Sequence, residues 1–124
     1  MARRTDPDAT AQLLSWLEGE RAWGRHALHA AAAQRERLQG ETHGLDQFAR
    51  RMALVSLTGS VARWANALHE GLSRNGQAGA AARFGEPPPF PATDAGPADC
   101  DRLRDYLNEH IDAIGEILAA SERV

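Results

Sequence analysis

The stretch LRDYLNEHIDAIGEIL, residues 103–118, carries the clearest structural pattern in the chain. Its apolar side chains recur every three or four residues, which places them on one face of an α-helix. Gly96 and Pro97, followed by Asp99, supply a suitable helix start. The pattern predicts an amphipathic helix over residues 97–122. Its apolar face consists of Leu103, Tyr106, Leu107, Ile111, Ile114, Ile117 and Leu118.

A second helix is predicted over residues 7–39. Asp6 suits an N-cap, Pro7 suits the first helical position, and Gly40 is placed to stop the helix. Gly19 and Gly24 lower the helix propensity of its middle and can bend it. The apolar stripe of this segment comprises Leu13, Trp16, Leu17, Trp23, Ala27, Leu28, Ala31 and Leu38.

Residues 43–74 contain two apolar stripes that point in nearly opposite directions. The first stripe consists of Leu45, Phe48, Met52 and Val55, and the second consists of Leu57, Val61, Trp64, Leu68 and Leu72. One straight helix cannot turn both stripes toward one core. The change of direction falls at Thr58-Gly59-Ser60, where helix propensity is low. We therefore predict a break near Gly59 and two helices, 43–58 and 60–74. The alternative is an unbroken helix covered on both sides, by a partner subunit or a wrapping loop.

The segment 76–96 is rich in glycine, alanine and proline, and differs from the rest of the chain. Residues 78–84 can form a short helical turn, whereas the proline run 87–91 is predicted to be extended. Phe84 and Phe90 are the expected anchors if this connection lies across the bundle. Asn75 and Gly76 mark the end of the preceding helix.

A chain of 124 residues with 43% hydrophobic and 25% charged residues fits one globular domain, residues 1–124. The fold class predicted is all-α and four-helix-bundle-like, with a long proline-rich connection before the last helix. Because the middle segment has a second apolar face, we also expect a homodimer, in which a symmetric partner covers that face.

Composition excludes several classes of protein. A net charge of −3 argues against a general nucleic-acid or anionic-membrane binder, and the single Cys100 excludes an internal disulfide framework. No apolar run is long enough for a membrane span, so a soluble cytoplasmic protein is expected. All 14 basic residues are arginine. Arginine binds carboxylates and phosphates through two hydrogen bonds, so the use of arginine alone could indicate such a ligand. A GC-rich, bacterial-like codon usage explains the absence of lysine without any ligand.

His110 falls within the apolar stripe of the last helix and is the main candidate ligand-binding residue. With Tyr106, Trp64 and Trp23 it could line a pocket for a small molecule. The alternative is a core histidine bonded to a backbone carbonyl. His26 and His29 point the same way on the first helix and are the weak candidates for a metal site, although two nitrogen ligands do not make one. The sequence implies no cofactor.

Two arginine–histidine pairs, Arg63 with His69 and Arg104 with His110, have a spacing that resembles the signature of helical ribonuclease toxins. The resemblance implies that a histidine and an arginine act together on an RNA phosphodiester. Such a spacing also arises by chance in a chain with 14 arginines and five histidines.

No residue set in the sequence forms a convincing catalytic constellation. The leading hypothesis is therefore a non-enzymatic helical interaction module, such as an adaptor, chaperone-like protein or regulatory subunit, with a protein partner. The alternatives are a small-molecule or metal-binding bundle centred on His110 and an RNA-cleaving helical enzyme. The residues expected at the interface are Phe48, Met52, Val55, Phe84 and Phe90.

Overall fold

A computed structural model describes residues 7–39, 45–91 and 96–122 and shows an all-α, bundle-like fold, as predicted. The helices are α1 (Pro7–Gln39), α2 (Leu45–Arg74), α3 (Ala78–Ala81) and α4 (Pro97–Glu122), and a 3-10 turn, η1 (Ala82–Phe84), follows α3. The described residues contain no strand. None of the helices in these ranges has the length and apolar composition needed to cross a bilayer.

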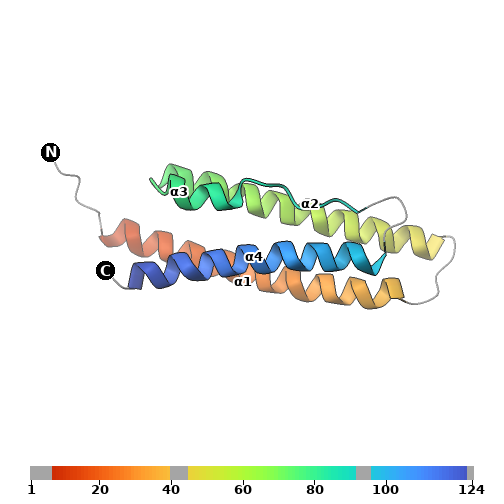
Figure 1. Ribbon diagram of the computed structural model, residues 1–124. Coiled ribbons are helices and arrows are strands. Elements are labelled where there is room, and N and C mark those ends of the chain that lie inside the picture. The colour runs from red at the N-terminus through yellow and green to blue at the C-terminus, as the bar shows by residue number, and fades with distance from the viewer. Residues whose placement is uncertain (1–6, 40–44, 92–95, 123–124) are drawn as a thin grey trace.

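The three long helices lie side by side, and the proline-rich connection completes the bundle (Figure 1). α2 runs antiparallel to α1, and α4 also runs antiparallel to α1, with which it makes the most extensive helix packing. Residues 85–91, here called the strap, run back along α2. An up-down-up-down bundle has a helix in that position. The strap thus replaces one helix of a four-helix arrangement.

The core of the protein is formed mainly by the predicted face of α4. Leu103, Leu107 and Ile114 are fully buried there, in one cluster with Leu17 and Ala27 of α1. The start of α4 also follows the prediction, because the Gly96 amide donates to the Asp99 carboxylate at 2.9 Å. This contact is the return bond of a capping box, which satisfies an amide that the helix leaves free.

The predicted break near Gly59 is wrong. α2 is one continuous helix from Leu45 to Arg74, so the segments 43–58 and 60–74 are not separate helices. Thr58 sits inside this helix with its hydroxyl donating to the Leu54 carbonyl at 2.8 Å, which satisfies the hydroxyl without disturbing the helix. The helix therefore passes through Thr58-Gly59-Ser60 intact, because packing outweighs the low local propensity.

The buried face of α2 contains most of the predicted second stripe, because Val61, Trp64, Leu68 and Leu72 are buried. Thr58 and Ala65 belong to it, although neither is a large apolar residue, and they alternate with leucine and valine at the three-and-four spacing of a bundle core. Leu57, in contrast, is only half-buried. In the first stripe Phe48 and Met52 are exposed and Val55 is half-buried, and the Leu45 side chain lies outside the described residues. The buried positions of α2 are Leu54, Thr58, Val61, Trp64, Ala65, Leu68 and Leu72.

Two glycines bring α1 and α2 close together by accepting tryptophan rings against the helix backbone. A Cβ atom at Gly24 of α1 would lie 2.9 Å from Cζ2 of Trp64, and one at Gly71 of α2 would lie 2.4 Å from Cη2 of Trp16. Each helix therefore supplies one ring and receives one. Gly24 therefore makes room for the Trp64 ring, and it does not interrupt α1, which is continuous from Pro7 to Gln39.

The end of α2 is set by Gly76, whose φ of 75° is a left-handed conformation that glycine adopts freely. The Gln77 amide donates to the Leu72 carbonyl at 2.8 Å and the Gly76 amide to the Ser73 carbonyl at 3.3 Å. These two bonds form a Schellman motif, which ends the helix at the predicted Asn75-Gly76.

The segment after α2 is attached to the bundle by several contacts. The predicted helical turn over residues 78–84 is confirmed, and the His69 ring donates to the Ala81 carbonyl at 2.8 Å. Phe84 is only 2% exposed, so it anchors the connection as expected. It is therefore part of the core and is not free to contact a partner, contrary to the interface prediction. Phe90 is 59% exposed and is not an anchor.

Candidate functional site

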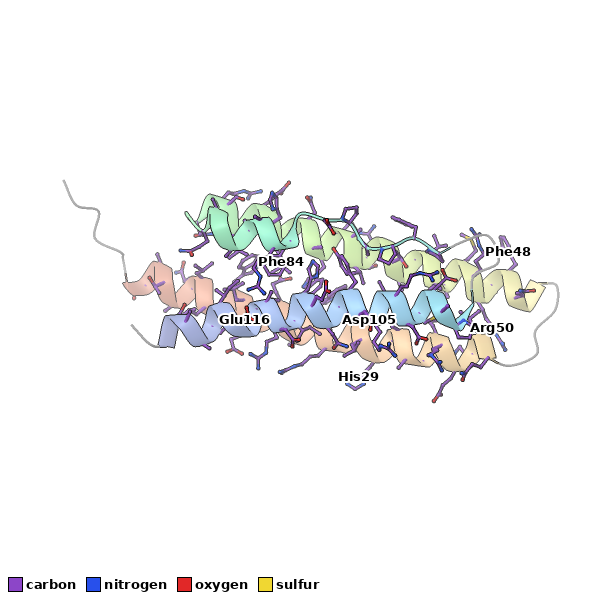
Figure 2. All side chains as sticks on the ribbon, in the orientation of Figure 1. His29, Phe48, Arg50, Phe84, Asp105 and Glu116 are labelled. Carbon is purple, nitrogen blue, oxygen red and sulfur yellow. The ribbon has the colours of Figure 1, made fainter. Side chains whose placement is uncertain are left out.

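The structure brings all four predicted ligand-binding residues together at the centre of the bundle. Ring centroids are 5.3 Å apart for Trp23 and Trp64, 5.7 Å for Trp64 and His110, and 4.0 Å for Tyr106 and His110. Phe84 joins them edge-on at 5.1 Å from His110. Figure 2 shows Phe84 directed from η1 toward α4. We call these five residues the aromatic–histidine cluster.

His110 holds one proton in a defined place. Its Nδ1 lies 2.9 Å from the Tyr106 carbonyl, and a carbonyl only accepts, so Nδ1 carries the hydrogen and donates it. Nε2 is then a bare acceptor, and within the described part of the chain it has no hydrogen-bond partner although it is buried. Burial lowers the pKa of His110, and the Tyr106 carbonyl and Glu109 oppose this more weakly. The imidazole is therefore neutral near pH 7.

The cluster is built as packed core rather than as an open ligand site. His110 is 5% exposed, and three rings surround it at contact distance. The Tyr106 hydroxyl donates to the Glu86 carbonyl of the strap at 2.6 Å, and burial raises the pKa of Tyr106 to about 12. Neither group is placed to exchange a proton with a bound molecule. The structure thus favours the core interpretation of His110 over the pocket interpretation.

A shallow hollow of about 620 Å³ lies beside the two tryptophans, between α1 and α2. Trp64 is fixed there because its indole N–H donates to the Glu20 carbonyl at 3.1 Å. Burial raises the pKa of the Glu20 carboxyl in the same place. The hollow is open to solvent, and His110 does not line it. Its lining consists of Gly19, Glu20, Trp23, Ser60, Arg63 and Trp64.

The neutral His110 predicts a stability that depends on pH. Its pKa is lowered in the folded state, so below about pH 6.5 the unfolded chain takes up a proton that the folded chain refuses. The free energy of unfolding should therefore fall as the pH drops from about 7 through 6. Urea denaturation at several pH values measures this fall. In the His110→Phe variant the fall in the free energy of unfolding between about pH 7 and 6 should be smaller. If this fall were the same as in the wild type, His110 would not be its cause.

Within the described residues, no further ligands join the predicted metal candidates His26 and His29. His26 and His29 are both exposed on α1, and Figure 2 shows His29 pointing away from the bundle. Across residues 7–39, 45–91 and 96–122, no three His, Cys, Asp or Glu side chains are grouped so that they could hold a metal ion. The two histidines therefore remain a pair of surface side chains.

Neither arginine–histidine pair is assembled for action on one phosphodiester. A separation of six residues rotates a helix by about 600°, which leaves the two side chains about 120° apart around the axis. Arg104 is exposed and donates to Asp101 and Asp105, whereas His110 is buried. His69 is bonded to α3, and Arg63 donates to the Ser60 hydroxyl at 3.2 Å.

The surface of α2 carries the predicted interface residues Phe48, Met52 and Val55. Phe48 is 60% and Met52 is 43% exposed, one turn apart on the same side of the helix, and Val55 is half-buried. Figure 2 shows Phe48 on the outer side of α2. Two large apolar side chains therefore lie close together at the surface of α2.

Comparison of the chain with protein-family models, curated proteins and solved structures finds no match, so no relative indicates what this surface or the cluster does.

Proposed function

We propose that the protein is a non-enzymatic helical interaction module whose partner is a second copy of the same chain. The observation that carries the proposal is the exposure of Phe48 and Met52 on the outer side of α2, whose inner side is buried. Association would remove this apolar surface from water, which is the main favourable term in the formation of protein interfaces.

The outer side of α2 is complementary to itself. A row of uncharged residues runs along this side of the helix. We call it the α2 stripe; it consists of Phe48, Met52, Val55, Gly59 and Ala62. Large side chains occupy one end of the row and small ones the other. A Cβ atom at Gly59 would meet only the tip of Arg63, at 3.8 Å, so the backbone there is open to close approach.

A two-fold axis near Val55 would place two α2 helices antiparallel to each other. Phe48 of one copy would then face Ala62 of the other, and Met52 would face Gly59, so that a large residue meets a small one at each place. In a two-fold interface every such contact occurs twice. This self-complementarity favours a second copy over an unrelated protein as the occupant of the α2 stripe.

Substitution of Phe48 by glutamate tests the proposal. Light scattering coupled to size exclusion should give about twice the 13.4 kDa chain mass for the wild type. Phe48→Glu and Met52→Glu should give the mass of one chain, because each places two unpaired charges in the interface. Both side chains are exposed, so the fold should persist, and circular dichroism checks this.

Phe90→Glu is the matched control. Phe90 has nearly the same exposure as Phe48, 59% against 60%, but it lies on the strap. This variant should keep the mass of the wild type. A wild-type mass of one chain at every concentration would refute the dimer, and dissociation by Phe90→Glu alone would move the interface from α2 to the strap.

A further inference from the structure

A narrow slot between α1 and α4 is separate from both the α2 stripe and the aromatic–histidine cluster. Its volume is about 190 Å³, and its lining has much more apolar than polar surface. That is space for about six waters at roughly 30 Å³ each, comparable to a short alkyl chain. The lining residues are Leu28, Ala31, Ala32, Arg35, Cys100, Asp101, Arg104 and Asn108.

The slot is apolar inside and charged along one side. Leu28, Ala31 and Ala32 line it from α1, and Cys100 lines it from α4. Burial, followed by the charges of Asp99 and Asp101, raises the pKa of the Cys100 thiol. The thiol therefore stays protonated and adds to the apolar lining rather than acting as a nucleophile.

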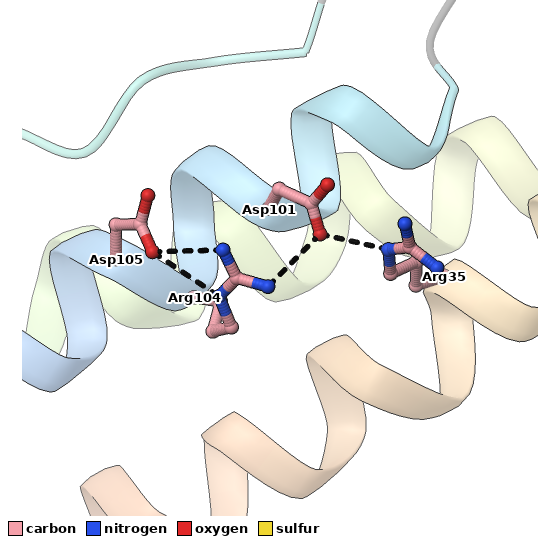
Figure 3. Close-up of polar contacts among 4 residues, drawn as sticks. All are labelled: Arg35, Asp101, Arg104 and Asp105. Atoms are coloured by element: carbon pink, nitrogen blue, oxygen red, sulfur yellow. Dashed lines mark hydrogen bonds and ion pairs between the residues drawn. The ribbon is translucent and has the colours of Figure 1, made fainter.

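The charged side of the slot has an arginine with unused donors. Arg35 donates through Nε to Asp101 at 2.7 Å, and Arg104 donates to the same Asp101 oxygen through Nη1 at 3.3 Å (Figure 3). Arg104 uses Nε and Nη2 on Asp105, at 3.1 and 3.0 Å. Among the described residues, no carboxylate or other acceptor is hydrogen-bonded to the Nη groups of Arg35. Asp101 and Asp105 together balance the charges of Arg35 and Arg104, so what remains at the slot is the hydrogen-bonding capacity of the Arg35 Nη groups.

We propose that this slot binds a small aliphatic carboxylate, with its carboxylate on the Nη groups of Arg35 and its alkyl chain among Leu28, Ala31, Ala32 and Cys100. A guanidinium donates two parallel hydrogen bonds to a carboxylate, and the Nη groups of Arg35 are the donors left for it. An apolar slot with a few fixed polar groups is the usual architecture of a small-molecule site. This ligand would be independent of the α2 stripe.

Titration of the full-length protein with hexanoate, followed by amide NMR shifts, tests the proposal. The shifts should be concentrated at Leu28, Ala31, Ala32 and Cys100. Acetate should bind at least about tenfold more weakly, because each buried methylene contributes about fourfold to affinity. Hexylammonium should not bind, because Arg35 repels its charge. Hexyl phosphate tests the other anion that a guanidinium recognises, and its binding in place of hexanoate would overturn the carboxylate assignment.

Two variants locate the site. Arg35→Gln should weaken hexanoate binding by about tenfold or more, because it removes a charge-assisted hydrogen bond. The fold should survive, because a partly exposed ion pair contributes little to stability. Ala32→Leu fills the slot from an exposed helical position and should abolish binding.

The matched control for Arg35 is Arg83, which pairs with Glu116 of α4 at 2.5 Å and does not line the slot. Arg83→Gln should leave the affinity for hexanoate unchanged. The proposal is overturned if millimolar hexanoate causes no shifts at the slot, if hexylammonium binds equally well, or if Arg35→Gln and Arg83→Gln behave alike.

Discussion

Replacing Phe84 with alanine should lower the free energy of unfolding by about 3–5 kcal/mol. Phe84 is 2% exposed and packs edge-on against the His110 ring, with centroids 5.1 Å apart. Its truncation leaves a cavity in the aromatic–histidine cluster and removes the apolar contact that holds η1 to the bundle. Urea denaturation followed by circular dichroism measures the loss, which is a large fraction of the stability of a domain of this size.

The same connection contains its own control, Phe90. Phe90→Ala should change the free energy of unfolding by no more than about 0.5 kcal/mol, because its side chain is 59% exposed. The contrast between the two phenylalanines measures how firmly the connection is attached. Equal and small effects of both substitutions would show that α3, η1 and the strap do not contribute to the core.

Gly24→Ala should destabilise the protein by about 2 kcal/mol, although alanine is the better helix former. The new Cβ would lie 2.9 Å from Cζ2 of Trp64 and 3.1 Å from Cγ1 of Ile111, both of which belong to buried side chains. Trp64 has little freedom to move, because its N–H is bonded to Glu20 and its ring lies between Trp23 and His110. The steric conflict of the new Cβ with these side chains costs up to about 3 kcal/mol. The higher helix propensity of alanine offsets about 1 kcal/mol of that cost.

Gly19→Ala should have the opposite sign. Nothing lies within 4 Å of a Cβ at Gly19, so only the gain in helix propensity of about 0.5–1 kcal/mol remains. Urea denaturation of both variants and the wild type gives the comparison within one helix. Stabilisation by Gly24→Ala would contradict the close approach of α1 and α2 at Trp64.

The regular helices were predictable because their signals are local. The apolar face of α4, its capping at Gly96 and Asp99, and the end of α2 at Asn75-Gly76 each depend on residues a few positions apart. In α2 the second stripe was largely right, but the prediction left out Leu54, Thr58 and Ala65 and wrongly placed a break near Gly59. Thr58 and Ala65 occupy core positions between leucine and valine, and their small volumes reveal nothing until a neighbouring helix is placed against them.

The candidate site was predictable in part. His110 and Tyr106 belong together because they are one turn apart on α4, and the tryptophans were expected in the core. Phe84 was expected only to anchor the connection, and its contact with His110 depends on how η1 folds back onto α4. The pairing of Arg35 with Asp101 joins residues on different helices, and no spacing in the sequence encodes it.

The sequence by itself determined the all-α class, the end of α2 at Asn75-Gly76, the start of α4 and the buried face of α4, because hydrophobic periodicity and capping act over one or two turns; the predicted caps Asp6 and Gly40 lie outside the described residues. Only the tertiary structure decided that α2 is continuous, that Gly24 and Gly71 receive tryptophan rings, and that Phe48 and Met52 stay at the surface. Those outcomes depend on which face each helix shares with its neighbours. Packing energy, which is summed over long-range contacts, outweighed the small local preferences at Thr58 and Gly59.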